Sequence, residues 1–155
     1  MSLWKLIRPA KYLHRLIYAI GLGPIIGRLI LLLTTTGRKS GKQRITPVQY
    51  EEINGTLYIG SARGSRADWV RNIDADPHIE VRVKSRHFRG IATLITDPLC
   101  IADYLQTRLE RHPLMVGLMM KMHQLPDKPS RTQLEELGKT LIVVALEPEV
   151  NQTNE

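Results

Sequence analysis

The segment from Thr34 to Arg44 concentrates hydroxyl groups, glycines and cations, and reads Thr-Thr-Thr-Gly-Arg-Lys-Ser-Gly-Lys-Gln-Arg. Glycines such as Gly37 and Gly41 let backbone N–H groups approach an anion closely, and the neighbouring cations and hydroxyls complete a set of donors. The segment is not a Walker A loop, because only three residues separate the glycines and Gln43 stands where Ser or Thr is required. The pattern favours an anion-binding turn, with a solvated hairpin loop as the alternative.

A second candidate site runs from Gly60 to Trp69, where an expected strand leads into an expected helix. A helix N-terminus attracts phosphate or carboxylate through its free N–H groups and its dipole. A hydrolase nucleophile elbow is excluded, because Ser61 directly follows Gly60 and the Gly-x-Ser-x-Gly spacing is missing. Taken alone, Trp69 is expected to anchor the core rather than to stack on a ligand.

Metal and disulfide chemistry find little support in the sequence. The five histidines show neither His-x-His nor His-x-x-x-His spacing, so no metal site is predicted. Cys100 is the single cysteine, which excludes an internal disulfide framework and a multi-cysteine metal or cluster site. A reducing, cytoplasmic setting is the expectation that follows.

The charges are distributed unevenly along the chain. The 155 residues carry 22 Lys and Arg against 15 Asp and Glu, a net charge of +7, yet the first acidic residue is Glu51. Nine cations precede it, so the whole positive excess belongs to the N-terminal third. This asymmetry predicts an anionic partner such as phosphate, a polycarboxylate, nucleic acid or lipid headgroups. Nucleic acid is disfavoured, because no aromatic side chains interleave the cations of the basic segment.

The N-terminal third also contains the most apolar part of the chain. Residues 3–20 have the pattern of a basic amphipathic helix, which either packs on the protein or lies in a membrane interface. Residues 20–33 are apolar over 14 positions, short of the ~20 that a membrane span needs, and they include Gly21, Pro24 and Arg28. No bilayer-spanning segment is predicted there.

Most of the remaining chain is predicted to form strands. Asn54-Gly55 and Ser85-Arg86 mark hairpin turns, and Pro47 places its strand at an edge or a bulge. The expected strands are 29–35, 43–50, 56–62, 78–84, 88–96 and 141–146, and the expected helices are 65–73, 97–112 and 130–138. No element is assigned to the Met-rich residues 115–122.

These elements predict a mainly β protein with peripheral helices (α+β), built as a small closed or split antiparallel β-barrel. Residues 1–24 are expected to form an N-terminal basic amphipathic helix and turn. Residues 25–150 are expected to form the barrel domain, and residues 151–155 a tail.

The motifs that carry a family resemblance are residues 31–41, Arg44-Ile45-Thr46-Pro47, Ser61-Ala62-Arg63-Gly64, and residues 68–73 with Asp76-Pro77. Their order and spacing, over about Leu29 to Pro148, resemble the deazaflavin-dependent nitroreductase family. Its members are also described as quinone reductases that use reduced coenzyme F-420. The resemblance implies a split β-barrel of the FMN-binding type.

The resemblance also implies a cofactor site, because coenzyme F-420 carries a phosphodiester and a polyglutamate tail. The matching motif positions assign the phosphate and tail to Arg38, Lys39, Ser40, Lys42 and Arg44. The deazaflavin ring is expected along Thr46, Pro47, Val48 and Gln49. Further cofactor contacts are expected from Ser61, Ala62, Arg63, Gly64, Asp68, Trp69, Val70, Arg71 and Asn72. In this context Trp69 becomes a pocket wall.

The implied reaction is hydride transfer from a reduced deazaflavin to a quinone-like or nitroaromatic acceptor. A proton donor near the acceptor would assist it. Some relatives place a tyrosine ahead of the last strand for this purpose, but here no tyrosine follows Tyr104, and His123 is the candidate in that region. The alternatives are the same fold binding FMN or haem, and a non-catalytic basic module binding anionic lipid or nucleic acid.

The Met-rich stretch and residues 3–20 fit a lipophilic acceptor drawn from a membrane surface. This predicts a cytoplasmic protein with a peripheral position on the inner face of the cell membrane. The same interpretation allows a homodimer.

Overall fold

The computed structural model describes residues 30–150 of the chain. The predicted helix at residues 3–20, the domain boundary at residue 24 and the tail at residues 151–155 lie outside this range. The predictions made for them therefore stay untested by the structure.

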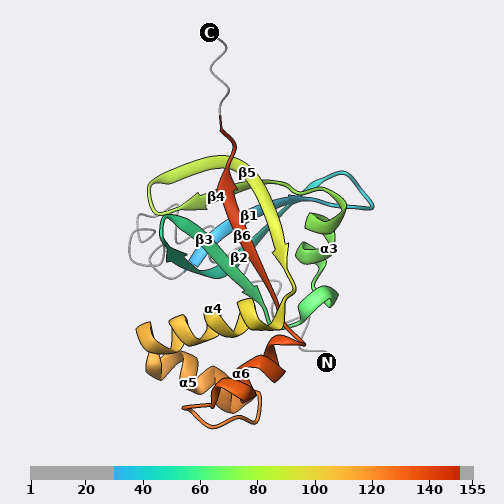
Figure 1. Cartoon of the computed structure of the whole chain (residues 1–155). Helices are drawn as coiled ribbons and strands as arrows, with labels where there is room; N and C mark the ends of the chain where they lie inside the picture. The colour runs from blue at the N-terminus through green and yellow to red at the C-terminus, as the bar shows by residue number, and fades with distance from the viewer. Residues whose placement is uncertain (1–29, 151–155) are drawn as a thin grey trace, which may run out of the picture.

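Six antiparallel strands close into a barrel in the order β1-β2-β3-β6-β5-β4 (Figure 1). They are β1 (Ile30–Thr36), β2 (Gln43–Ile53), β3 (Thr56–Ser61), β4 (His78–Val83), β5 (Arg86–Ile95) and β6 (Ile142–Pro148). β1 pairs with β2 over its whole length and with β4 through Leu32–Thr34, and this second pairing closes the barrel. The mainly β fold class is confirmed.

Alternating side chains build one core inside the barrel and a second core outside it. In β6, Ile142, Val144 and Leu146 belong to the barrel core, whereas Val143 packs among the helices. Both faces of β6 are therefore covered, which explains its uninterrupted apolar run. β4 shows the alternation expected from its sequence, with every second side chain buried.

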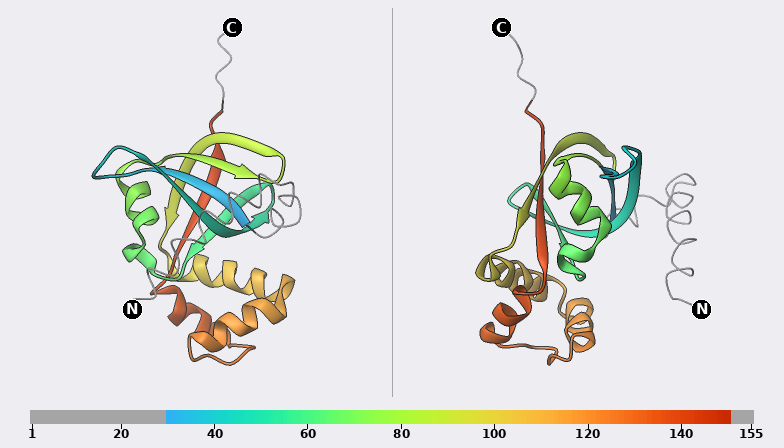
Figure 2. Two further views of the ribbon diagram at one scale, coloured as in Figure 1. Left: turned by 180° about the vertical axis from the view of Figure 1, so that it is seen from behind. Right: turned by 90° about the vertical axis from the view of Figure 1, so that its right-hand side faces the viewer.

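The helices lie in two places outside the barrel (Figure 2). They are the short 3-10 helix η1 (Gly64–Arg66), α3 (Asp68–Ala75), α4 (Pro98–Arg111), α5 (Pro113–Met122) and α6 (Arg131–Gly138). α3 lies beside the barrel wall, whereas α4, α5 and α6 form a layer at one end of the barrel (Figure 1). The predicted helix at 65–73 is divided, because Ala67 adopts an extended conformation and buries its methyl group in the barrel core.

The helix ends follow the predicted capping signals. The Asp97 side chain accepts a hydrogen bond at the start of α4, and Ser130 and Gln133 form the expected capping box of α6. The Met-rich segment forms α5, although no element was predicted there. Pro113 occupies the first turn of that helix, and its inner side chains join the helical core.

The hairpin turns are set by residues with positive φ. Asn54 and Gly55 have φ of 52° and 83° and form the predicted β2–β3 turn. The β4–β5 turn lies on Lys84 and Ser85, one residue earlier than predicted, because Val83 pairs with Arg86 and Lys84 takes a φ of 52°.

β2 pairs with a different neighbour in each part of its length. It pairs with β1 from Gln43 to Gln49, whereas its pairing with β3 covers Tyr50 to Ile53. Pro47, which has no N–H to donate, lies in the part that pairs with β1 alone. The edge position predicted from Pro47 is therefore confirmed for this part of the strand, which has one unpaired edge. β2 as a whole lies between β1 and β3 in the barrel.

A buried carboxylate joins the barrel to the helical layer. Glu51 of β2 is 7% exposed in its side chain and meets three basic groups near the C-terminal end of α4. Its oxygens lie 3.6 Å from Nε of Arg108, 2.8 Å from Nη1 of Arg111 and 3.1 Å from Nε2 of His112. Breaking this cluster would leave the buried Arg108 without a counter-charge.

Candidate functional site

The β1–β2 turn is a closed, hydrogen-bonded structure. The N–H of Gly37 donates to the Lys42 carbonyl and the N–H of Gly41 donates to the Gly37 carbonyl, both at 2.8 Å. The N–H of Lys42 donates to Oγ of Ser40 at 3.2 Å, and Gly41 has a φ of +69° that favours glycine. These N–H groups are used inside the turn, so the predicted approach of the glycine N–H groups to an anion is not what the structure shows. An anion would meet the side chains of the turn.

Arg38 fastens this turn to α3. Its Nη1 donates to Oδ1 of Asn72 at 2.9 Å, its Nη2 lies 3.2 Å from Oδ1 of Asp68, and its backbone N–H donates to the same Asn72 oxygen at 3.2 Å. Asn72 is buried and donates in turn to Oγ1 of Thr35 at 3.4 Å. Three predicted cofactor residues, Arg38, Asp68 and Asn72, are thus brought together, and they bind one another.

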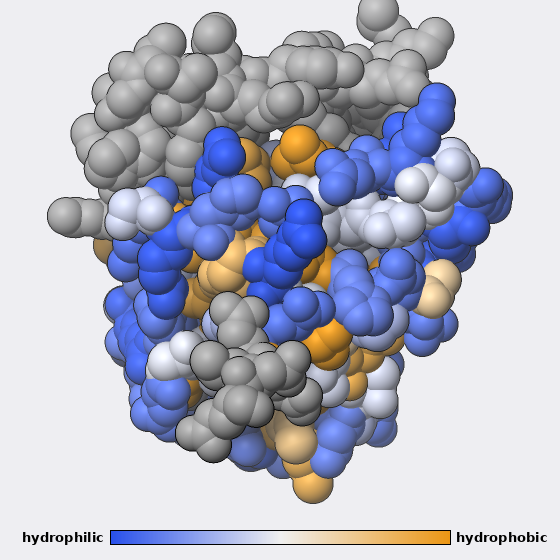
Figure 3. Space-filling model, turned by 90° about the horizontal axis from the view of Figure 1, so that it is seen from above, coloured by the Kyte–Doolittle hydropathy of each residue, from blue (hydrophilic) through white to orange (hydrophobic). Residues whose placement is uncertain are grey.

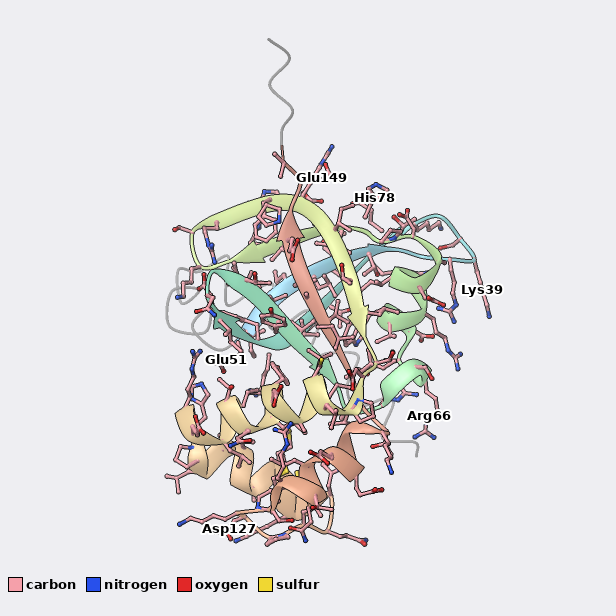
Figure 4. All side chains as sticks on the ribbon, viewed as in Figure 1. Lys39, Glu51, Arg66, His78, Asp127 and Glu149 are labelled. Carbon is pink, nitrogen blue, oxygen red and sulfur yellow. The ribbon has the colours of Figure 1, made fainter. Side chains whose placement is uncertain are left out.

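The cations around this network remain exposed. Lys39, Lys42 and Arg44 extend from the turn, and Arg66 and Arg71 lie on η1 and α3. Figure 4 shows Lys39 and Arg66 projecting on the side of the barrel that carries α3. The cationic face therefore combines the turn with the segment that follows β3, two regions that the sequence separates.

The segment after β3 is shaped by Gly64 and Ser61. Gly64 has a φ of +57°, and a Cβ atom there would lie 2.6 Å from the Thr140 carbonyl oxygen. The buried Ser61 hydroxyl donates to the Gly64 carbonyl at 3.0 Å. No side-chain cap is formed at Ala67, so the first N–H groups of α3 are left to solvent or a ligand. Ser61 and Gly64 thus determine the course of this segment. The Ser61 side chain is buried, and a side chain at position 64 would point into the protein.

The N-terminal half of β2 connects the turn with the helical layer. Thr46, Pro47 and Val48 are half-buried and Gln49 is exposed. Nε2 of Gln49 lies 3.9 Å from Sδ of Met115 in α5. From Arg44 to Gln49 an extended strand covers about 17 Å, enough for a long ligand to run from the cations to α5.

Two residues predicted on α3 have different surroundings. Trp69 is half-buried and packs against the barrel core, with one side left accessible. Val70 is 2% exposed and belongs to the barrel core itself. The structure therefore places the Val70 side chain where a ligand cannot reach it. Arg71 is exposed, and its Nε donates to the Ser65 carbonyl at 3.1 Å.

A polar cavity of about 260 Å³ lies where β1 separates from β4 beyond Thr34, and sequence reasoning missed it. Its lining residues are Thr34, Thr35, Thr36, Gln43, His78, Ile79, Glu80, Arg89 and Glu149. Figure 4 shows His78 and Glu149 at the barrel end opposite the helical layer, and the described surface there is mainly hydrophilic (Figure 3). Nδ1 of His78 lies 2.8 Å from Oδ1 of Asp76, and this hydrogen bond lowers the pKa of Asp76. The cavity is lined by residues of four strands, β1, β2, β4 and β5, and by Glu149 after β6, so no local pattern could have indicated it.

His123, the proton-donor candidate, ends α5 in the helical layer. It is half-buried, and its backbone N–H donates to the carbonyls of Met119 and Met120. Along α5 it lies about 12 Å from Met115, the residue that contacts β2.

Among residues 30–150, no group of three or more His, Cys, Asp and Glu side chains could hold a metal ion. Within the same range, no helix is long and apolar enough to cross a membrane.

The model of the F-420H(2)-dependent quinone reductase family matches residues 17–113, more than half of the chain. The chain belongs to this family. Membership makes it an oxidoreductase that depends on coenzyme F-420, and the family name gives no support to FMN.

Solved structures that resemble this F-420-dependent family member share its fold. An F-420-H2 dependent reductase is 22% identical with a TM-score of 0.53, and the match covers 77% of this chain and 95% of that one. A protein described as a domain-swapped dimer is 21% identical over 90% and 99% of the chains, with a TM-score of 0.54. HutZ, a haem storage protein of Vibrio cholerae, is 14% identical over 80% and 84%, with a TM-score of 0.53.

Proposed function

We propose that this family member transfers a hydride from reduced coenzyme F-420 to a lipophilic, quinone-like acceptor. The observation that carries the proposal is the set of exposed cations on the turn that Arg38 fastens to α3. This turn borders one end of the open β2 edge, which runs from Gln43 to Gln49, and α5 contacts the other end of that edge at Gln49. A nitroaromatic acceptor would fit the same apolar end.

The cationic end suits an anionic phosphate and polyglutamate tail. Lys39, Lys42 and Arg44 would hold these groups, with the Ser40 hydroxyl as an added donor. Arg38 would act as a positioning residue, because its guanidinium is occupied by Asp68 and Asn72. The exposed N–H groups at the start of α3 would supplement the cations.

The β2 edge suits a flat ring. Thr46, Pro47, Val48 and Gln49 would lie along it, and Trp69 would form the wall toward α3. Ala62 and Arg63 would contribute from the segment after β3, whose course Ser61 and Gly64 determine. When bound, the reduced cofactor supplies a hydride from a ring carbon and does not readily pass single electrons.

The protein then contributes mainly the position of the two reactants and the exclusion of competing acceptors, and a proton donor would assist the transfer. The half-buried side chains of Met115 and Met119 form an adaptable apolar wall beside Gln49 for the acceptor. His123 is the proposed proton donor. Residues 3–20 are proposed to bring the protein to the inner face of the membrane, and a homodimer is allowed, since a structure of the same fold is described as a dimer.

Two measurements test the proposal. The purified protein is titrated with F-420, FMN and haem, and the bound cofactor, in its reduced form, is then oxidised anaerobically by a menaquinone analogue. F-420 should bind tightest and be oxidised in the presence of the analogue. Lys42→Ala combined with Arg44→Ala should weaken F-420 binding by about tenfold or more, whereas Arg82→Ala, at an exposed cation of β4, should not. Tighter binding of FMN or haem, or F-420 binding without oxidation, would contradict it.

A further inference from the structure

Helix α5 is apolar on both its inner and its outer face. Val116, Gly117 and Met120 are buried on the inside of the helical layer. On the outside, Leu114, Leu118 and Met122 are 90%, 64% and 79% exposed. A helix that is apolar all round is normally covered on every side, so the outer face of α5 calls for an apolar partner.

The outer side chains form one continuous stripe. Leu114, Leu118 and Met122 follow one another at intervals of four residues, which places them on the same face. The half-buried Met115 and Met119 extend the stripe toward the barrel, where Met115 contacts Gln49. Ten residues are too few to cross a bilayer, but they suit a helix that lies in the plane of a membrane interface.

The charges at α5 favour an anionic lipid surface over a protein partner. From Arg111 to His123 the chain contains no acidic residue, and the exposed Lys121 lies on α5 next to Met122. Arg111, which precedes the helix, is held by Glu51 at 2.8 Å. The neighbouring carboxylates of Glu110 and Asp127 line a cavity of about 400 Å³ that begins at Leu114, and the cations Lys128 and Arg131 line the same cavity. Exposed apolar side chains beside a free cation, in a stretch without acidic residues, favour binding to an anionic interface.

We propose that α5 docks on anionic lipid bilayers, inserting Leu114, Leu118 and Met122 and placing Lys121 among the headgroups. This surface is distinct from residues 3–20 and does not depend on the redox activity. It would set the Gln49 edge of β2 next to the apolar phase.

A probe on the stripe tests the contact directly. In the full chain with Cys100→Ser, Leu118→Cys is labelled with an environment-sensitive fluorophore and mixed with vesicles of phosphatidylglycerol and phosphatidylcholine. We expect a blue shift and a several-fold rise in emission, and neither for Leu99→Cys, which is 54% exposed on α4. No change at residue 118 would overturn the proposal. So would emission that is already blue-shifted before vesicles are added, because protein would then cover the stripe.

Vesicle co-sedimentation of the full chain measures how much the stripe contributes. Replacing Leu114, Leu118 and Met122 together by Ser should lower the partition coefficient about tenfold or more, whereas Leu99→Ser should leave it unchanged. Binding of the triple variant at the wild-type level would assign the membrane contact to residues 3–20 and overturn the role of α5. F-420 affinity in solution, measured on the same variants, should stay constant, so failure here is distinguishable from failure of the proposed cofactor site.

Discussion

Arg38 and Lys39 are adjacent cations with different surroundings. The Arg38 guanidinium is 24% exposed and bound by Asp68 and Asn72, whereas Lys39 extends into solvent from the turn. A planar group with several donors can tie a turn to a helix, and a flexible ammonium can meet a mobile anion. Arg38 therefore holds the turn against α3, and Lys39 is the neighbour that we propose to meet the ligand.

Arg38→Ala should lower the free energy of unfolding by about 1 to 2 kcal/mol, a value reduced because Asp68 is largely exposed. Lys39→Ala should leave this free energy within about 0.5 kcal/mol of wild type and should weaken F-420 binding directly. Urea denaturation and ligand titration of both variants separate the two effects. Equal losses of stability in the two variants would contradict these assignments.

Tyr104 carries a buried hydroxyl for which the described residues provide no hydrogen-bond acceptor or donor. Burial raises the pKa of Tyr104, so the unfolded chain loses this proton at a lower pH than the folded chain. Stability should therefore decline as the pH rises above about 10, the ordinary tyrosine value.

Tyr104→Phe should remove that part of the alkaline decline and raise the free energy of unfolding at pH 7 by about 1 kcal/mol. Tyr58→Phe is the control, because Tyr58 is half-buried at a ring distance of 6.3 Å from Tyr104. Denaturation curves between neutral and alkaline pH provide the measurement. A loss of stability at pH 7 would show that the Tyr104 hydroxyl is satisfied.

At the scale of elements, β2 performs three tasks along its length. Its first half borders the cationic turn and leaves one edge open, its middle contacts α5 through Gln49, and its last part pairs with β3. Glu51 then anchors α4 to the barrel. Glu51 therefore helps to fix the helical layer relative to the β2 edge, together with the apolar contacts of Val143 in the helical core.

Glu51→Gln should lower the free energy of unfolding by about 3 kcal/mol, because the buried Arg108 loses its counter-charge. Glu52→Gln, one residue along the strand, should change it by less than about 1 kcal/mol, since its 3.4 Å pair with Arg86 is partly exposed. Thermal or urea unfolding compares the two. Similar losses for both variants would show that the cluster contributes no more than a surface pair.

At the scale of the whole molecule, the net charge of +7 reflects an N-terminal third without any acid, and the described part of that excess gathers on one side of the barrel. A protein surface that carries charges of one sign attracts ligands of the opposite charge through the solvent, and dissolved salt screens this attraction. Cofactor binding and membrane binding, as proposed, would share this dependence.

Raising the salt concentration from about 0.05 M to about 0.5 M should lower the F-420 association constant by about tenfold, because the cations of the turn are exposed. The affinity for an uncharged menaquinone analogue serves as the control and should change little. Fluorescence titration at several salt concentrations provides both values. A salt-independent F-420 affinity would place the anionic tail away from Lys39, Lys42 and Arg44.

Local patterns predicted much of the architecture. Alternation located the strands to within three residues at each end, and Asn54-Gly55, Asp97-Pro98 and the Ser130 capping box marked turns and helix ends. The local patterns did not predict α5, because this Met-rich helix has no polar face opposite its buried one. They also did not predict that the buried Ala67 would divide the helix expected at 65–73.

The sequence by itself determined the barrel strands, the asymmetry of charge and the basic turn, because side-chain periodicity and charge are properties of neighbouring residues. Only the tertiary structure decided that Arg38 turns inward to Asn72, that β2 keeps an open edge at Pro47, and that α5 meets Gln49. Each of these depends on segments more than ten positions apart, and their contact follows from barrel closure and core packing rather than from any local preference.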